Sequence, residues 1–236
     1  MVKLRAVLFD LDDTLYPERD YVWSGFRAVS QWAQRRWAIS QEASYETLCQ
    51  LFEAGARRDT FDQWLRRSGL EQKTCLEEIL HVYRTHAPQI AAYPEAPGVL
   101  ERLAHGVLIG LVSDGPVAIQ EGKLTALNLR HHFQCVVFTD VWGTAFRKPN
   151  PRGFKEALST LRVRPGAAAY VGDNPAKDFL GARQLGMLAV RVRTPEGLYA
   201  QLEPETLAET PNAEIQSLAD LERCLAEIAV LSDEDG

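Results

Sequence analysis

The sequence predicts an α/β protein in which a doubly wound parallel sheet with a Rossmann-like core carries an inserted α-helical domain. Two observations support this fold class: short apolar runs alternate with amphipathic helical patterns, and one long region interrupts the alternation. Alternating strands and helices are typical of a parallel sheet covered by helices on both faces. Because such strands are buried on both sides, they appear as nearly continuous apolar runs.

Five apolar runs are the expected strands of this sheet. They are AVLFDL (6–11), VLIGLVS (107–113), CVVFTD (135–140), AAYVGD (168–173) and LAVRV (188–192). Apolar residues also recur at helical spacing in two later segments, residues 154–161 and 218–228. These segments predict helices that pack on the sheet.

The interruption extends over residues 17–93, which contain no strand-like run. Apolar residues at helical spacing form one stripe within 22–37, a second within 76–83 and part of a third near Phe61. Prolines stand at both ends of this region, as is common at domain boundaries (Pro17, Pro88, Pro94 and Pro97). We therefore expect a core domain built from residues 1–16 and 94–236, and a helical cap domain from 17–93.

The amino-acid composition argues against some classes of function for this chain. The 236 residues are 46% hydrophobic and 25% charged, which is ordinary for a globular protein with ample core material. The net charge of −6 argues against nucleic acid polymers and anionic membranes as partners. No apolar stretch is long enough to span a bilayer, and Asp10 interrupts the N-terminus before a signal-peptide apolar region forms. The composition does not predict an oligomeric state.

The cysteines indicate the compartment. Cys49, Cys75, Cys135 and Cys224 do not form a Cys-x-x-Cys pair, and a chain of this size does not need disulfides. We interpret all four as buried thiols in a reducing environment. Together with the absence of a leader-like N-terminus, this predicts a cytoplasmic protein.

Polar and charged residues follow four of the predicted strands. In open α/β sheets, ligands bind beyond the carboxyl ends of the strands. Carboxylates placed so close together repel one another, and burying them is costly without a cation or hydrogen bonds. Either these acids lie on a solvated turn or a positive group binds among them. The residues are Asp10, Asp12 and Thr14 after the first strand, Ser113 and Asp114 at the second, Lys148 after the third, and Asp173 and Asp178 after the fourth.

These residues resemble a known set of motifs. DLDDT, the serine at the second strand end, the lysine before proline and GDNPAKD are similar to the four motifs of the haloacid dehalogenase superfamily. They occur in the same order and span most of the chain. Each motif alone is a weak signal, but four in order at strand ends are a strong one. Residues 17–93 resemble the cap that these proteins insert after their first motif.

The resemblance implies a role for each acidic residue. Asp10 would be the nucleophile that attacks phosphorus and becomes an aspartyl-phosphate. Mg²⁺ would bind to the side chains of Asp10 and Asp173 and the backbone carbonyl of Asp12, with Asp178 nearby or connected through water. Asp12 would protonate the leaving oxygen and then deprotonate the attacking water. Such a role needs a raised pKa, which neighbouring carboxylates would favour.

The remaining residues would bind the substrate. Ser113 and the backbone N–H of Asp114 would bind phosphoryl oxygens, and Thr14 belongs to the same predicted group. Lys148 would offset the negative charge of the nucleophile and of the phosphate. Taken singly, each residue has an ordinary alternative. Aspartate, serine and threonine at strand ends often cap helices or form turns, and a lysine before proline can be a solvated loop charge.

Asp12 also separates branches of the superfamily, because the dehalogenase branch lacks an aspartate there. The sequence therefore predicts a Mg²⁺-dependent phosphomonoester hydrolase of a small phosphorylated metabolite such as a nucleotide or sugar phosphate, with a cap that opens and closes over the site. A phosphomutase remains an alternative, and a phospho-accepting signalling module or a catalytically silent interaction protein is a weaker one. The sequence leaves open whether Tyr16, Arg19 or Trp23 contacts the substrate.

Overall fold

A computed structural model describes residues 3–70 and 76–231 of the chain. The chain forms two compact units, one from residues 1–19 and 91–236 and the other from residues 20–90. The expected boundaries, after residues 16 and 93, each lie three residues away from these.

The first unit contains a six-stranded, wholly parallel sheet in the order β3-β2-β1-β4-β5-β6. All five predicted strands are present, and the predicted fold class is confirmed. The sixth strand was missed because three residues are too few to show a pattern. The strands are β1 (Ala6–Phe9), β2 (Leu108–Ser113), β3 (Cys135–Phe138), β4 (Ala168–Gly172), β5 (Leu188–Val192) and β6 (Ala213–Ile215).

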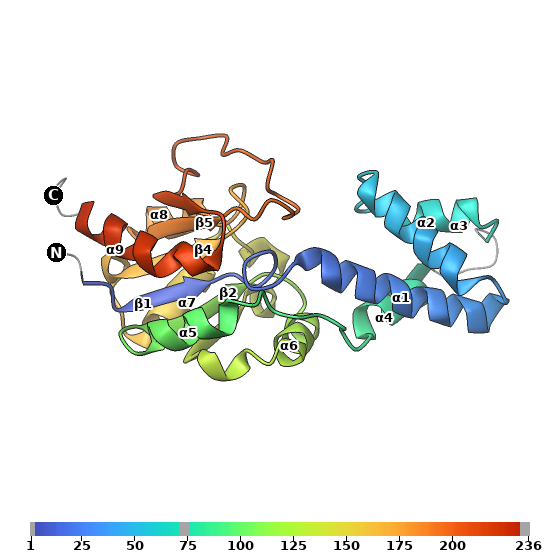
Figure 1. Cartoon of the computed structure of the whole chain (residues 1–236), viewed down its shortest axis with the longest axis horizontal. Helices are drawn as coiled ribbons and strands as arrows, with labels where there is room; N and C mark the ends of the chain where they lie inside the picture. Colours follow the sequence, from blue (N-terminus) through green and yellow to red (C-terminus); the bar gives the residue numbers. More distant parts are fainter. Residues whose placement is uncertain (1–2, 71–75, 232–236) are drawn as a thin grey trace. The chain divides into compact units, whose positions relative to one another are not determined.

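Helices cover both faces of this sheet (Figure 1). On one face, α7 (Arg152–Leu161) and α8 (Phe179–Gln184) bury Phe154 and Phe179 against Leu8 and Tyr170 of the central strands. On the other face, α5 (Ala96–Ala104) packs on β2 and on α9 (Leu221–Leu231). The helix α6 (Val117–Ala126) follows β2 directly. Short 3₁₀ turns occupy connections: Arg130–His132, Thr139–Trp142, Thr144–Phe146, Pro165–Ala167 and Leu218–Asp220.

The strand order determines where a ligand can bind. From β1 the chain proceeds outward through β2 and β3, and it then returns to β4 on the other side of β1. The connections that leave β1 and β4 therefore diverge, which opens a crevice at the carboxyl ends of these two adjacent strands. Asp10 follows β1 and Asp173 follows β4, so both acids lie at this switch point.

The second unit is helical and has an aromatic core. The Phe26 ring lies 6.1 Å from that of Phe52 and 5.8 Å from that of Phe61, and the rings of Phe61 and Tyr83 are 5.4 Å apart. All three pairs have the edge-to-face arrangement that aromatic rings favour. The helices are α1 (Glu18–Trp37), which begins in the first unit, α2 (Gln41–Glu53), α3 (Thr60–Arg67) and α4 (Leu76–Thr85).

Two expectations from composition can be compared with the structure. Within residues 3–70 and 76–231, no helix has both the length and the apolar character needed to span a bilayer. Cys135 and Cys224 are buried, but Cys49 is only half-buried, so the expectation of a buried thiol is wrong there. Cys75 lies outside the described residues.

Candidate active site

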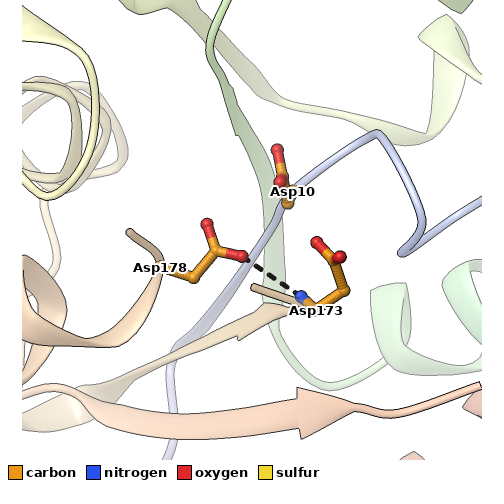
Figure 2. A group of neighbouring side chains, drawn as sticks. All are labelled: Asp10, Asp173 and Asp178. Atoms are coloured by element: carbon orange, nitrogen blue, oxygen red, sulfur yellow. Dashed lines mark hydrogen bonds between the residues drawn. The ribbon is translucent and has the colours of Figure 1, made fainter. Parts of the chain in front are cut away.

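Three buried carboxylates meet at the crevice between β1 and β4. Asp10 follows β1, Asp173 follows β4, and Asp178 is the N-cap residue of α8. They come from two loops and a helix start (Figure 2), and one oxygen of each lies within 4.8 Å of those of the other two. Their side chains are almost inaccessible to solvent. Three negative charges this close need compensation from positive groups.

The donor set fits a hard divalent cation. One oxygen of Asp10, Oδ2, and one of Asp173, also Oδ2, are buried without a hydrogen-bond partner among the described residues. Leaving a buried carboxylate oxygen unpaired is costly, and native structures rarely do so without a reason. Burial raises the pKa of Asp10, although Lys148 and Lys177 oppose it, and burial followed by the charge of Asp178 raises that of Asp173. Clustered carboxylate oxygens are the ligands that Mg²⁺ prefers.

Lys148 supplies one positive charge inside the cluster. Its Nζ lies 2.8 Å from Oδ1 of Asp10, 2.8 Å from Oδ1 of Asp178 and 2.8 Å from the Tyr170 hydroxyl. Burial disfavours its charge, but the adjacent Asp10 and Asp178 carboxylates outweigh this and raise the pKa of Lys148 above its usual value. A second ammonium, Lys177 Nζ, lies 3.7 Å from Oδ2 of Asp10. Both ammonium groups therefore lie close to the carboxylate of Asp10, the predicted nucleophile.

The backbone around Asp173 is held from two sides. Oδ2 of Asp178 accepts hydrogen bonds from the backbone N–H groups of Asp173 and Asn174, at 3.1 and 2.9 Å. The fully buried Arg191 donates from Nε to the carbonyl oxygen of Asp173 at 3.0 Å. Gly172 makes room for this arrangement, since a Cβ there would lie 2.6 Å from Oδ2 of Asp178. Both oxygens of the Asp178 carboxylate therefore contact groups of the protein, Oδ1 the Lys148 ammonium and Oδ2 two backbone N–H groups, and these contacts orient the neighbouring residues.

Asp12 has a different environment, although it is only two residues from Asp10. Lys123 Nζ lies 2.7 and 2.9 Å from the two carboxylate oxygens of Asp12. Gln120 Nε2 donates to Oδ2 at 3.1 Å, and the Tyr16 hydroxyl donates to Oδ1. The carboxylate of Asp12 is thus surrounded by donors and does not belong to the three-acid cluster.

The expected raised pKa of Asp12 is wrong for this structure. Burial does raise the pKa of Asp12, but the charge of Lys123 and the hydrogen bonds from Lys123, Tyr16 and Gln120 together lower it below the usual value. The expectation considered only the neighbouring acids in the sequence. The largest lowering comes from Lys123, more than 100 positions away in the sequence, followed by the hydrogen bonds from Tyr16 and Gln120.

Asp13 holds the loop that follows β1. Its backbone adopts a left-handed conformation with φ of 50°, which turns the chain sharply after Asp12. Its buried carboxylate accepts hydrogen bonds from the backbone N–H of Glu18 and of Leu198, both at 2.8 Å. One side chain therefore connects the loop after β1 to the start of α1 and to the segment after β5.

The predicted phosphate-binding residues lie beside these groups. Ser113 ends β2, is fully buried, and its Oγ accepts a hydrogen bond from Gln120 at 2.7 Å. The carboxylate of Asp114 accepts from the Thr139 hydroxyl at 2.7 Å and from the backbone N–H of Lys148 at 3.1 Å, so this side chain braces the loop that carries the lysine. The buried Thr14 hydroxyl has no hydrogen-bond partner within the part of the chain that the structure describes.

The structure thus connects most of the predicted residues and adds some that were missed. Lys148 is ion-paired with Asp10 and Asp178, and Asp173 lies beside these two acids. Asp12 and Ser113 belong to a second group that is joined by Gln120. The missed partners are Gln120 and Lys123 in the first two turns of α6, and Lys177 inside the GDNPAKD motif. Two polar residues three positions apart on the buried side of α6 were the available signal.

Comparison with known proteins gives consistent matches. A family model for haloacid dehalogenase-like hydrolases matches residues 4–186. A glyceraldehyde 3-phosphate phosphatase from Methanopyrus kandleri is 34% identical over 235 residues, covering 96% of this chain and 99% of the relative. A phosphoserine phosphatase from Thermus thermophilus is 37% identical over 192 residues, covering 81% of this chain and 73% of the relative.

A solved structure agrees with these matches. The crystal structure of a HAD phosphatase from Thermococcus onnurineus shares 27% sequence identity, covers 94% of this chain and 98% of its own, and superposes with a TM-score of 0.61. The family model covers well over half of the residues of the chain, and the matched range includes Asp10, Asp173 and Asp178. The chain therefore belongs to the haloacid dehalogenase-like hydrolase family.

Proposed function

We propose that the chain is a Mg²⁺-dependent phosphomonoester hydrolase that acts on a small phosphorylated metabolite through an aspartyl-phosphate on Asp10. One observation carries the proposal. Lys148 fixes one oxygen of the Asp10 carboxylate, and the other oxygen lies beside Asp173, 3.7 Å from Lys177 Nζ and without a hydrogen-bond partner among the described residues. A nucleophile needs such an oriented oxygen that no hydrogen bond occupies. The phosphatase names of the relatives support a phosphate ester as substrate.

The first half-reaction transfers the phosphoryl group to Asp10. An oxygen of Asp10 forms a bond to phosphorus while the bond from phosphorus to the ester oxygen breaks, and the departing oxygen takes a proton from Asp12. Lys148 balances charge on Asp10, and Ser113 is placed at the end of β2 to hold a phosphoryl oxygen. Mg²⁺ bound by Asp10 and Asp173 would supply further positive charge for the phosphate.

The second half-reaction releases inorganic phosphate. A water attacks phosphorus, the bond between phosphorus and the Asp10 oxygen breaks, and Asp12 accepts the proton of the water. In the structure the donors around Asp12 favour its carboxylate form, which is the form this step requires. After the step Asp12 carries the proton that the next leaving group takes up, so the proton balance closes over one cycle.

The proposal also gives a role to residues 17–93 and a cellular location to the protein. Residues 17–93 would act as a cap that selects the substrate, which is consistent with the separate compactness of residues 20–90. A cytoplasmic location is supported by the unpaired thiols of Cys49, Cys135 and Cys224.

The test is phosphate release by the wild type and by Asp10→Asn, with Asp59→Asn as a matched control at an exposed position. A panel of phosphorylated sugars, nucleotides and small acids serves as substrates. We expect phosphate release by wild type and Asp59→Asn and none by Asp10→Asn, which should still unfold cooperatively. EDTA should stop release by the wild type, and Mg²⁺ should restore it. Retained turnover in Asp10→Asn rejects the nucleophile, and transfer to a second hydroxyl without phosphate release indicates a phosphomutase.

A further inference from the structure

The helix α6 buries two polar side chains that touch no reacting atom in the reaction as described. Gln120 is 1% exposed and Lys123 is 5% exposed, and they lie three residues apart on the same side of the helix as Leu124. Burying a glutamine and a lysine costs side-chain entropy and desolvation, so such residues are rarely buried without specific partners. Their placement therefore calls for a functional or structural reason.

The polar ends of both side chains reach Asp12. Lys123 Nζ contacts both carboxylate oxygens, at 2.7 and 2.9 Å, and its side chain is 6% exposed against 13% for Asp12. Because one ammonium nitrogen contacts both oxygens, Lys123 fixes the position of the carboxylate. The separate hydrogen bonds from Gln120 to Oδ2 and from Tyr16 to Oδ1 fix its plane, since rotation about the Cβ–Cγ bond would break them.

Gln120 adds a link to the phosphate-binding side. The same Nε2 atom lies 3.1 Å from Oδ2 of Asp12 and 2.7 Å from Oγ of Ser113. One amide group thus spans the predicted acid–base group and the predicted phosphate-binding hydroxyl. Gly115 leaves the room for it, because a Cβ there would lie 3.3 Å from the Gln120 side chain, and its φ of 128° is strained for other residues.

We propose that Gln120 and Lys123 are positioning residues for the hydrolytic reaction: Lys123 orients the Asp12 carboxylate and Gln120 sets its spacing from Ser113. This inference rests on the proposed function. It differs from a direct role in substrate binding, because Lys123 acts through Asp12 and Gln120 acts through Asp12 and Ser113. Their contribution should therefore depend on how much the reaction needs Asp12.

Esters with different leaving groups distinguish a positioning role through Asp12 from a direct role in substrate binding. An alkoxide cannot depart readily without a proton, whereas nitrophenolate can, so a misplaced Asp12 should impair alkyl esters more than aryl esters. A defect in folding or in phosphate binding would reduce both to the same extent. The comparison therefore reports on the acid–base step alone.

The experiment measures kcat and KM for 4-nitrophenyl phosphate and for glycerol 3-phosphate. The variants are Lys123→Met and Gln120→Met, with Asp12→Asn as the reference and Lys155→Met, at an exposed position on α7, as the control. For Lys123→Met we expect kcat on the alkyl ester to fall at least about tenfold more than on the aryl ester, with KM within about threefold. Gln120→Met should show the same pattern more weakly, and Lys155→Met should match the wild type.

A double variant makes the test independent of folding yield. If Lys123 acts through Asp12, Asp12→Asn combined with Lys123→Met should be no slower than Asp12→Asn alone, within about threefold. Equal losses on both esters, a defect confined to KM, or additive losses in the double variant would overturn the inference. If the wild type releases phosphate from no ester of the panel, the proposed function itself fails, and the inference with it.

Discussion

Asp10 and Asp12 are the same residue type, two positions apart in one loop, and the structure gives them opposite environments. Asp10 is paired at one oxygen with Lys148 and keeps a second oxygen without a hydrogen-bond partner among the described residues. Both oxygens of Asp12 are bound by donors from α6 and from Tyr16. The Asp10 carboxylate thus keeps one oxygen that no hydrogen bond occupies, whereas the Asp12 carboxylate is held in a fixed orientation.

The direction of the pKa shift also differs between the two acids, because burial dominates at Asp10 while donors outweigh burial at Asp12. A group that attacks phosphorus needs an accessible lone pair, and a group that exchanges protons needs a controlled orientation. The two environments therefore match the roles that we propose for Asp10 and Asp12, although the residue type is the same.

The largest expected effect comes from removing the cation on the Asp10 side. Lys148→Met would leave Asp178 buried without its ion pair and Asp10 without its fixed partner. Breaking a buried pair on one side costs about 3–5 kcal/mol of stability. Urea denaturation measures this loss, with Lys155→Met as control. A loss below about 1 kcal/mol would show that the cluster does not depend on Lys148.

A more selective effect is expected on the Asp12 side. Asp12→Asn should reduce kcat on an alkyl ester by about 10²–10⁴, the usual contribution of acid–base catalysis. Because its carboxylate lies outside the three-acid cluster, the affinity for Mg²⁺ measured by calorimetry should stay within about threefold of the wild-type value. Mg²⁺ binding that disappears together with activity would contradict the separation of the two acids.

A third prediction concerns Glu18, the first residue of α1. Burial and the charge of Asp12 raise the pKa of Glu18 to about 7, although Lys123 and Lys177 oppose the shift and Asp13 adds to it. A carboxyl whose folded-state pKa is raised stabilises the fold less as pH rises from about 4.5 to about 7, because the folded form binds the proton more tightly than the unfolded form.

Glu18→Gln removes this penalty. We expect the variant to be more stable than the wild type above pH 7, by on the order of 1 kcal/mol after allowance for partial exposure, and equal to it below about pH 4.5. Urea denaturation without divalent ions at several pH values measures the difference. A gain that does not change with pH would assign the effect to packing instead of titration.

The residues at the strand ends could be predicted because their signals are local. Asp10 and Asp173 each lie directly after a short apolar run, and parallel strands bring their carboxyl ends together, so these two residues meet without any knowledge of side-chain packing. Lys148 lies beyond two 3₁₀ turns that follow β3 and was predicted from the resemblance of its motif. The short strand β6 had no comparable pattern.

The donors around Asp12 could not be predicted in this way. Gln120 and Lys123 act on Asp12 only because α6 packs against the loop after β1, which is a tertiary arrangement. The same cause made the expected pKa shift of Asp12 wrong. The selecting role of residues 17–93 stays a prediction.

Trapping the intermediate tests the central claim most directly. Wild-type protein is mixed with Mg²⁺ and a phosphate ester, quenched during turnover and reduced with borohydride, which converts an acyl phosphate of aspartate to homoserine. Cleavage after Arg5 and Arg19 releases a peptide that contains Asp10, Asp12 and Asp13, and tandem mass spectrometry locates the change. We predict homoserine at position 10 alone. Homoserine at position 12 or 13, or none while phosphate is released, would contradict the account.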